Sequence, residues 1–440
     1  MSTFNLPARP SLEQLQKQAK ELLRDYRADD ARAVARIGAG TKPVLADVQF
    51  VLAREHGFAT WAALKRHLDV RSDPHGLSAA PPFYRIDWEE NIIELRLPFD
   101  LKDWSKILEV VKESRITGIR AMGQMTDDVL VAVSKLEHVT HLNLDGSDVT
   151  DAGLRQLAAM PQLQHLELTR CPITNAGLGV LGELRELRSF FLYHHSGVSD
   201  EGLAHLETCE RLERVDLLGT NSGDVVLKAL AEKPALRHLK PGNRVSNAGL
   251  ELLHHFPVYK NWRGGQGKIG LMEFSDEPNH LLLRGTFTDE GVAKLVGLDG
   301  LFALNLDDRN SRVTAAGLKP LAKLPNLGWL GFDATDEAMP HIAAMPRLRM
   351  LMCQDTVSGD DGFVALSKSR SIEYIWGRRC YGLGGRGFRA IAGMPALRGL
   401  SVSCKNVDDG ALSTLPSFPS LVEFMPMDVP DEGFRHVAQG

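Results

Sequence analysis

The chain has 440 residues, of which 43% are hydrophobic, and its 51 Lys and Arg against 56 Asp and Glu give a formal net charge of -5 at pH 7. This balance lacks the basic excess of nucleic-acid-binding surfaces, and no apolar run approaches the roughly 20 residues that span a bilayer. The five cysteines include no CxxC pair and the N-terminus has no charged and apolar leader, so we expect a cytoplasmic protein without disulfides, membrane insertion or a nucleic-acid partner.

The first predicted domain is a helical module at residues 1–70. Apolar residues at helical spacing follow Ser11, a good capping residue, and a second such set lies at residues 45–52. A third helix is expected from Thr60 to Leu68, so the module has three or four helices. Residues 71–83 are rich in Pro, Ser, Ala and Gly, a composition that indicates a linker.

Residues 84–125 form the next predicted segment and do not follow the pattern that comes after them. Their apolar residues predict a strand from Ile92 to Leu97 and a helix from Trp104 to Val111. We interpret this segment as an atypical first unit that caps the open end of a repeat array, as terminal repeats usually do.

From residue 126 to the end, one phrase recurs at a spacing close to 24 residues, which predicts about 13 units. It reads Thr or Ser, then Asp or Asn, a variable residue, and Gly-Leu, as at Thr150 to Leu154. Between these phrases, apolar residues stand at positions 1, 4, 6 and 9, as in Leu163, Leu166, Leu168 and Cys171. The alternation predicts a strand and the spacing after Gly-Leu a helix, with the Thr or Ser as helix N-cap. A fixed period of this size indicates a solenoid.

These phrases resemble the leucine-rich repeat family, in its bacterial form with a Thr-Asp-x-Gly-Leu helix start, over roughly residues 116–440. The resemblance implies an α/β solenoid, a horseshoe with a parallel β-sheet on the concave face and helices on the convex face. Residues 6–15 and 52–61 are similar to a helical module that precedes ankyrin and other repeat arrays in bacterial proteins. An F-box-like adaptor, which also begins near Leu-Pro, remains a minor alternative at Leu6 and Pro7.

One step of the array is too long. Gly249 and Gly291 are 42 residues apart, about 18 more than one unit, which makes the unit at residues 250–290 irregular. Two interpretations stay open: a degenerate repeat with a short loop, or a loop that leaves the strand side. The Gly-rich run 263–268 is not a phosphate loop, because Trp262 and Ile269 stand where that motif needs Gly and Ser or Thr. Insertions in repeat arrays often map to the binding face.

Side chains alternate along a strand, so positions 3, 5 and 7 of each unit are expected on the concave face. Aromatic, methionine and arginine side chains gather at these positions in the C-terminal units, beside depressions expected at Gly331 and Gly399. Such an exposed strip with a charged rim is typical of protein interfaces, whereas a register slip of one residue would bury it. The predicted partner-binding residues are Trp329, Asp333, Met350, Met352, Gln354, Tyr374, Trp376, Arg378 and Arg379.

The other candidates for chemistry have structural explanations. Cys353 and Cys380 fall at inward positions and are expected in the core, while Cys404 falls at position 8 and is expected to be partly exposed. Recurring acidic pairs such as Asp200 and Glu201 lie at helix starts, where they stabilise the helix dipole. The chain has no local nucleophile motif and no His pair at metal-ligand spacing. We therefore predict no catalytic residue, no metal site and no cofactor.

The sequence thus predicts a non-enzymatic scaffold or recognition module that binds a protein or peptide partner on the concave face. An alternative is a small-molecule or peptide sensor that uses the depression beside Trp376 and Arg378. An enzyme would need a closed polar pocket with perturbed titratable groups. No feature of the sequence specifies an oligomeric state.

Overall fold

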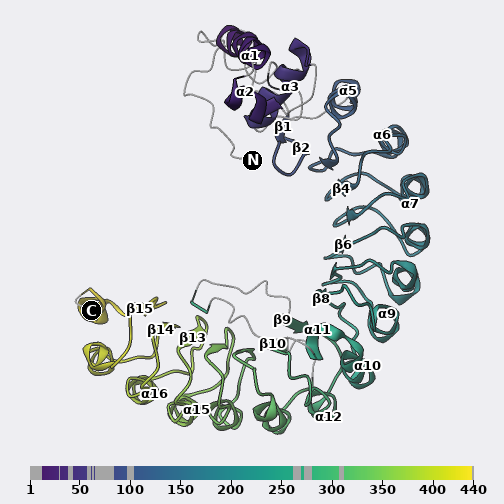
Figure 1. The fold of residues 1–440 in the computed structure, drawn as a ribbon. Helices are drawn as coiled ribbons and strands as arrows, with labels where there is room; N and C mark the ends of the chain where they lie inside the picture. Colours follow the sequence, from purple (N-terminus) through teal and green to yellow (C-terminus); the bar gives the residue numbers. More distant parts are fainter. Residues whose placement is uncertain are drawn as a thin grey trace. The chain divides into compact units, whose positions relative to one another are not determined.

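The structure is a computed structural model that describes residues 12–28, 30–37, 43–56, 61, 64, 84–96, 104–260, 269–271, 280–306 and 312–438. The chain divides into two compact units, Met1–Leu166 and Glu167–Gly440. The first begins with short helices and continues into repeats, and the second contains repeats only (Figure 1). None of the helices in the described ranges combines the length and the apolar character that crossing a membrane requires.

The N-terminal helices pack around a small apolar core. They are α1 (Leu12–Arg27), α2 (Ala31–Ile37) and α3 (Leu45–Glu55). The helices predicted from Leu12 and at residues 45–52 are confirmed, whereas α2 was not predicted. The core consists of Ala19, Leu22, Leu23, Ala33, Val48 and Leu52. Of the third predicted helix only Trp61 and Leu64 are described, and Ser11 and the predicted linker 71–83 lie outside the described residues.

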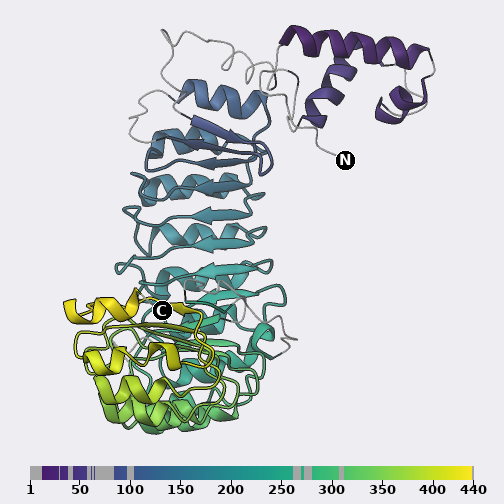
Figure 2. The same cartoon turned by 90° about the vertical axis from the view of Figure 1, so that its left-hand side faces the viewer.

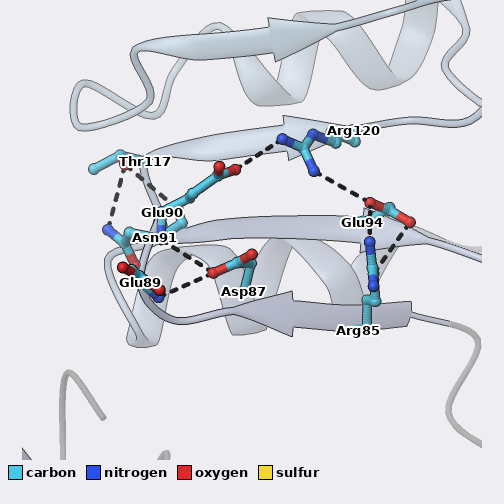
Figure 3. Close-up of polar contacts among 8 residues, drawn as sticks. All are labelled: Arg85, Asp87, Glu89, Glu90, Asn91, Glu94, Thr117 and Arg120. Atoms are coloured by element: carbon cyan, nitrogen blue, oxygen red, sulfur yellow. Dashed lines mark hydrogen bonds and ion pairs between the residues drawn. The ribbon is translucent and has the colours of Figure 1, made fainter. Parts of the chain in front are cut away.

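An antiparallel hairpin closes the N-terminal edge of the sheet. It pairs β1 (Tyr84–Asp87) with β2 (Ile92–Leu95), and β1 was not predicted. Figure 3 shows the polar contacts that hold it: Arg85 donates two hydrogen bonds to Glu94, at 3.1 and 2.9 Å, and Arg120 reaches both Glu94 and Glu90. The hydrogen bond from Arg85 holds the pKa of Glu94 below its usual value. An edge strand blocked by paired charges resists pairing with other chains.

Parallel strands and helices alternate through the rest of the first unit, and Figure 2 shows the strands stacked in chain order. The strands are β3 (Gly118–Arg120), β4 (His141–Asn143) and β5 (His165–Glu167). The helices are α5 (Ser105–Glu113), α6 (Asp127–Val133), α7 (Asp151–Leu154) and the 3-10 helix η1 (Arg155–Ala159).

The second unit continues the same alternation, with strands on the inner side of an arc and helices on the outer side (Figure 1). Its strands are β6 (Ser189–Phe191), β7 (Arg214–Asp216), β8 (His238–Lys240), β9 (His280–Leu283), β10 (Ala303–Leu306), β11 (Trp329–Gly331), β12 (Met350–Met352), β13 (Tyr374–Gly377), β14 (Gly399–Val402) and β15 (Glu423–Phe424). The α-helices are α8 (Asp200–Leu203), α9 (Asp224–Leu230), α10 (Asn247–Leu252), α11 (Pro257–Lys260), α12 (Asp289–Ala293), α13 (Ala315–Leu318), α14 (Met339–Ala343), α15 (Asp360–Leu366), α16 (Gly385–Ile391), α17 (Asp409–Leu412) and α18 (Phe434–Val437). The 3-10 helices are η2 (Gly177–Glu183), η3 (Ala204–Thr208), η4 (Leu253–His255), η5 (Lys319–Lys323), η6 (Leu415–Ser417) and η7 (Asp431–Gly433).

The strand register agrees with the predicted positions. Position 4 of successive units forms one fully buried row that packs against the helices, and position 3 forms a row on the opposite, concave face. The position-4 row is Leu304, Leu330, Leu351, Ile375 and Leu400, and the position-3 row is Ala303, Trp329, Met350, Tyr374 and Gly399. The fold therefore assigns each strand residue to the face that the alternation predicts.

A ladder of hydrogen bonds explains the repeated phrase. The Thr hydroxyl caps its own helix, as where Thr150 Oγ1 accepts the N–H of Ala152 at 3.1 Å. The acid at the next position reaches the following unit: Asp127 Oδ1 accepts the N–H of Thr150 at 2.8 Å. A side chain on Gly153 would place its Cβ 2.1 Å from that oxygen, so the motif needs glycine there. The sequence predicts the helix cap, whereas the bond between units is seen only in the structure.

The same hydrogen bonds connect the two units on either side of the 42-residue step from Gly249 to Gly291. Asn247 Oδ1 accepts the N–H of Thr288 at 2.8 Å, and Val245 forms a parallel bridge with Gly285. The units that contain Gly249 and Gly291 are therefore immediate neighbours. The surplus residues lie between Lys260 and His280, and the structure describes 269–271 among them.

Candidate functional site

The aromatic strip lies on the predicted face but is covered. We define it as Trp329, Met350, Tyr374 and Trp376. The relative exposure is 3% for Trp329, 2% for Met350 and 7% for Trp376, so the prediction that these side chains are exposed is wrong. The register has not slipped, because Trp329, Met350 and Tyr374 lie side by side in the position-3 row.

The long step supplies the cover. Ile269 and Leu271, from the middle of the insertion, pack against the aromatic strip together with Phe302 and Met425. Leu271 is only 1% exposed. A Cβ added to Gly399 would lie 2.5 Å from Tyr374 Cδ1 and 3.0 Å from Leu271 Cγ, so Tyr374 and Leu271 together fill the depression predicted there.

Next to the strip, the concave face opens into a pocket of about 570 Å³. A volume of this size falls within the roughly 300–1,000 Å³ of small-molecule sites. The pocket lies toward the carboxyl ends of β9 to β13, where the position-5 and position-7 side chains and their flanks meet. It is lined by Leu282, Arg284, Asn305, Leu306, Gly331, Phe332, Asp333, Met352, Gln354, Asp355 and Arg379.

The structure divides the nine predicted site residues between these two places. Four line the pocket: Asp333, Met352, Gln354 and Arg379. The four strip residues do not line it, and Arg378 turns away, with Nη2 donating to Met427 Sδ at 3.3 Å and its guanidinium 5.3 Å from the Trp376 ring. The depression at Gly331 was predicted, but Leu282 and Arg284 were not predicted as site residues. The irregular spacing between Gly249 and Gly291 gives no strand register for β9.

Hydrogen bonds brace the wall of the pocket formed by Gln354. Trp376 Nε1 donates to Gln354 Oε1 at 2.6 Å, and the carbonyl of Gln354 accepts the N–H of Arg379 at 2.9 Å. Asp333 Oδ1 accepts the N–H of Asp355 at 2.8 Å, and Arg379 forms an ion pair with Asp355. The buried Trp376 therefore holds the Gln354 side chain at the edge of the covered strip.

Among the described residues that line the pocket, the charges balance. The positive charges of Arg284 and Arg379 face the negative charges of Asp333 and Asp355. The hydrogen bond to Asp355 raises the pKa of Arg379 and favours its charged form. A pocket with no charge excess does not favour an anionic or cationic ligand on electrostatic grounds.

Two amide side chains in the pocket keep hydrogen-bonding capacity. Within the described part of the chain, the Asn305 side chain forms no hydrogen bond, and Gln354 uses its oxygen for Trp376 while its NH₂ group has no acceptor. Each amide offers donors and an acceptor in one plane. The pocket thus combines apolar lining, balanced charges and free amide groups.

The cysteines do not add a chemical site. All five are free and buried. Cys404, expected to be partly exposed, is 0% exposed, because position 8 faces the core here; burial raises its pKa to about 12 and that of Cys380 to about 11. Across the described ranges, no three His, Cys, Asp or Glu residues are arranged to hold a metal ion.

Comparisons with known proteins concern the fold. A family model for leucine-rich repeats matches residues 135–158 and 160–182. Similar solved structures include an internalin from Listeria monocytogenes, at 18% identity over 68% of this chain and 83% of that one, with a TM-score of 0.45. Another is a chain of the yeast Rad7–Elc1 complex, at 18% identity over 73% of this chain and 84% of that one, with a TM-score of 0.40. No curated protein matches the sequence. The matched repeats and the alternation of parallel strands and helices identify the fold as a leucine-rich repeat solenoid.

Proposed function

We propose that the chain is a non-enzymatic interaction module, and that its C-terminal repeats bind a protein partner on the concave face at the pocket. The observation that carries this proposal is the open pocket of about 570 Å³ in the middle of a rigid parallel sheet. Solenoids of this kind use their extended concave surfaces for binding. The surface that remains available comprises the pocket and its charged rim, and the covered aromatic strip lies next to it on the same face.

The properties of the whole chain are consistent with a protein partner in a reducing compartment. Five free, buried thiols support the proposed cytoplasmic location, because a secreted protein with this many cysteines usually forms disulfides. The net charge of -5 supports a partner other than nucleic acid.

A matched pair of charge reversals tests the proposal. Arg379→Glu changes the pocket rim, and Arg386→Glu changes a helix-side arginine that is equally exposed and also pairs with an Asp. We expect affinity purification from native lysate to recover at least one stoichiometric protein with the wild type and with Arg386→Glu, but not with Arg379→Glu. Equal recovery with both variants, or no stoichiometric protein with the wild type, would refute the proposal.

A small-molecule sensor is the second candidate, and the volume of the pocket is the observation that favours it. A ligand that binds only the folded state stabilises it by about 2.7 kcal/mol at a concentration of 100 Kd. We expect such a ligand to raise the melting temperature of the wild type by several degrees, and that of Arg379→Glu much less. A metabolite panel that leaves the melting temperature unchanged counts against the sensor and leaves the interaction module as the better explanation.

A further inference from the structure

We propose that the pocket binds an extended, uncharged peptide segment through its main chain, with one aliphatic side chain against its apolar lining. This inference rests on the proposed function and names the chemistry of the partner. Asn305 and Gln354 recognise peptide groups of the bound segment. Leu282 and Met352 contact its side chain.

The amide groups indicate the type of hydrogen bond. A peptide group presents one N–H donor and one C=O acceptor, and a carboxamide side chain offers the complementary pair in one plane. Among the described residues, Asn305 has no hydrogen-bond partner for its side-chain donor or acceptor. Gln354 Oε1 accepts from Trp376 at 2.6 Å, and the Gln354 NH₂ group has no acceptor there. Pairing with main-chain groups satisfies both side chains whatever the sequence of the bound segment.

The apolar lining indicates the side chain. Gly331 stands in the position-5 row between Asn305 and Met352, and a Cβ there would lie 2.8 Å from Asn305 Cγ. That position therefore has no room for a side chain of its own, and the apolar contacts of the pocket come from Leu282, Leu306, Phe332 and Met352. Such contacts favour an aliphatic group over a polar one.

The charges of the described rim residues give neither an anionic nor a cationic ligand an electrostatic advantage. Arg284 and Arg379 are matched by Asp333 and Asp355, and Arg379 is already bound to Asp355. A phosphate, a carboxylate or a basic peptide would have to break this pair or face the charge of its own sign. An uncharged segment avoids both costs.

The chain itself gives a precedent on the adjacent part of the same face. Ile269 and Leu271 place aliphatic side chains on the aromatic strip, and Gly270 between them forms a β-bridge. Two aliphatic side chains from a distant part of the chain are therefore already packed against this face of the sheet. The pocket continues that surface toward the carboxyl ends of the strands.

A phage-displayed library of random heptapeptides, selected on the immobilised full chain, tests the inference. We expect the enriched peptides to share one aliphatic residue and to be poor in charged residues. Asn305→Leu and Gln354→Glu should each weaken binding about three- to tenfold, the loss expected for one or two neutral hydrogen bonds. Gln354→Glu keeps the acceptor for Trp376, and Gln164→Glu makes the same change of charge outside the pocket and should leave binding unaltered.

A second measurement does not depend on the variants folding well. In the strongest heptapeptide, replacing successive amide N–H groups by ester oxygens should weaken binding to the wild type at one or two positions. The inference is overturned if the selected peptides bind both pocket variants as tightly as the wild type, or if no ester replacement weakens binding. Enriched peptides that share a charged residue, or a selection without enrichment, also overturn it. The proposed function is judged separately, because a lysate partner lost with Arg379→Glu supports concave-face binding even when its recognition chemistry differs.

Discussion

The glycine of the repeat phrase stands where the acid of the preceding unit needs space. At Gly249, a Cβ would lie 2.1 Å from Asp224 Oδ1, the atom that accepts the N–H of Ser246 at 2.9 Å. Glycine recurs at this position of the repeat because of this contact between units, and not because of an unusual backbone conformation. The phrase is recognised in the sequence by its period. The hydrogen-bond partner of Asp224 is Ser246 of the next unit, and a local motif does not reveal a partner in another unit.

Replacing this glycine should therefore destabilise the second unit. We expect Gly249→Ala to lower the free energy of unfolding by about 1–3 kcal/mol, the usual cost of overpacking, because Asp224 must move and lose its bonds to Ser246. Gly179→Ala is the control, since the nearest atom lies 4.0 Å away, and helix propensity predicts no loss. Urea unfolding of both variants gives the comparison, and equal stabilities would contradict the ladder.

A second residue-scale prediction concerns the first unit, where His141 stacks on His165 with ring centroids 3.9 Å apart. Burial, and then the charge on His165, lower the pKa of His141 from 6.5 to about 4. A lowered pKa in the folded state means that stability is retained above pH 6.5 and is lost as the pH falls toward 4. NMR titration should give a midpoint near 4 for His141, and His165→Gln should raise it. A midpoint of 6.5 for His141 in the wild type would contradict the burial of this side chain against His165.

At the scale of elements, the strands and the insertion differ in how well the sequence predicts them. The face of each strand residue follows from alternation, so the positions of Trp329, Met350 and Tyr374 were predicted correctly. The covering of these side chains was not predicted, because Ile269 and Leu271 belong to a segment without periodicity that lies far from the strip residues in the sequence. The same gap in periodicity hid Leu282 and Arg284, two residues of the pocket.

Removing the main contact of the insertion should expose the strip. Leu271 is 1% exposed, so a carboxylate at this position cannot stay in place without water, and Leu271→Asp should detach the covering segment. In fluorotryptophan-labelled protein, we expect the fluorine NMR signals of Trp329 and Trp376 to move toward their unfolded positions. Val225→Asp, at a helix position that is 55% exposed, is the control and should leave both signals unchanged. Unchanged signals in Leu271→Asp would show that the cover is held by other contacts.

At the scale of the whole molecule, the scattered cysteines predicted a chain without disulfides, while the repeat period predicted the solenoid and its architecture. The candidate site was predicted only in outline. Four of its residues were named, but the pocket depends on the place where the insertion stops covering the sheet, and no pattern in the sequence specifies that boundary.

The distribution of cysteines gives a test of the whole fold. All five are buried in the repeats, and burial raises the pKa of Cys209 and Cys380 to about 11. Because thiolates rather than thiols react, we expect the native chain to leave its thiols unmodified by a disulfide reagent at pH 8, and all five to react in concentrated urea. Rapid reaction of any thiol in the native state would place that cysteine at the surface.

The bond from Thr288 to Asn247 has a consequence for how the chain can change. This bond and the bridge of Val245 to Gly285 join the two flanking units directly. The pairing of these units is therefore independent of the number of residues between Lys260 and His280. Residues can be gained or lost there without shifting any strand. This is the position at which a descendant sequence, or a designer, can exchange the covering segment and thereby give the same scaffold a different concave surface.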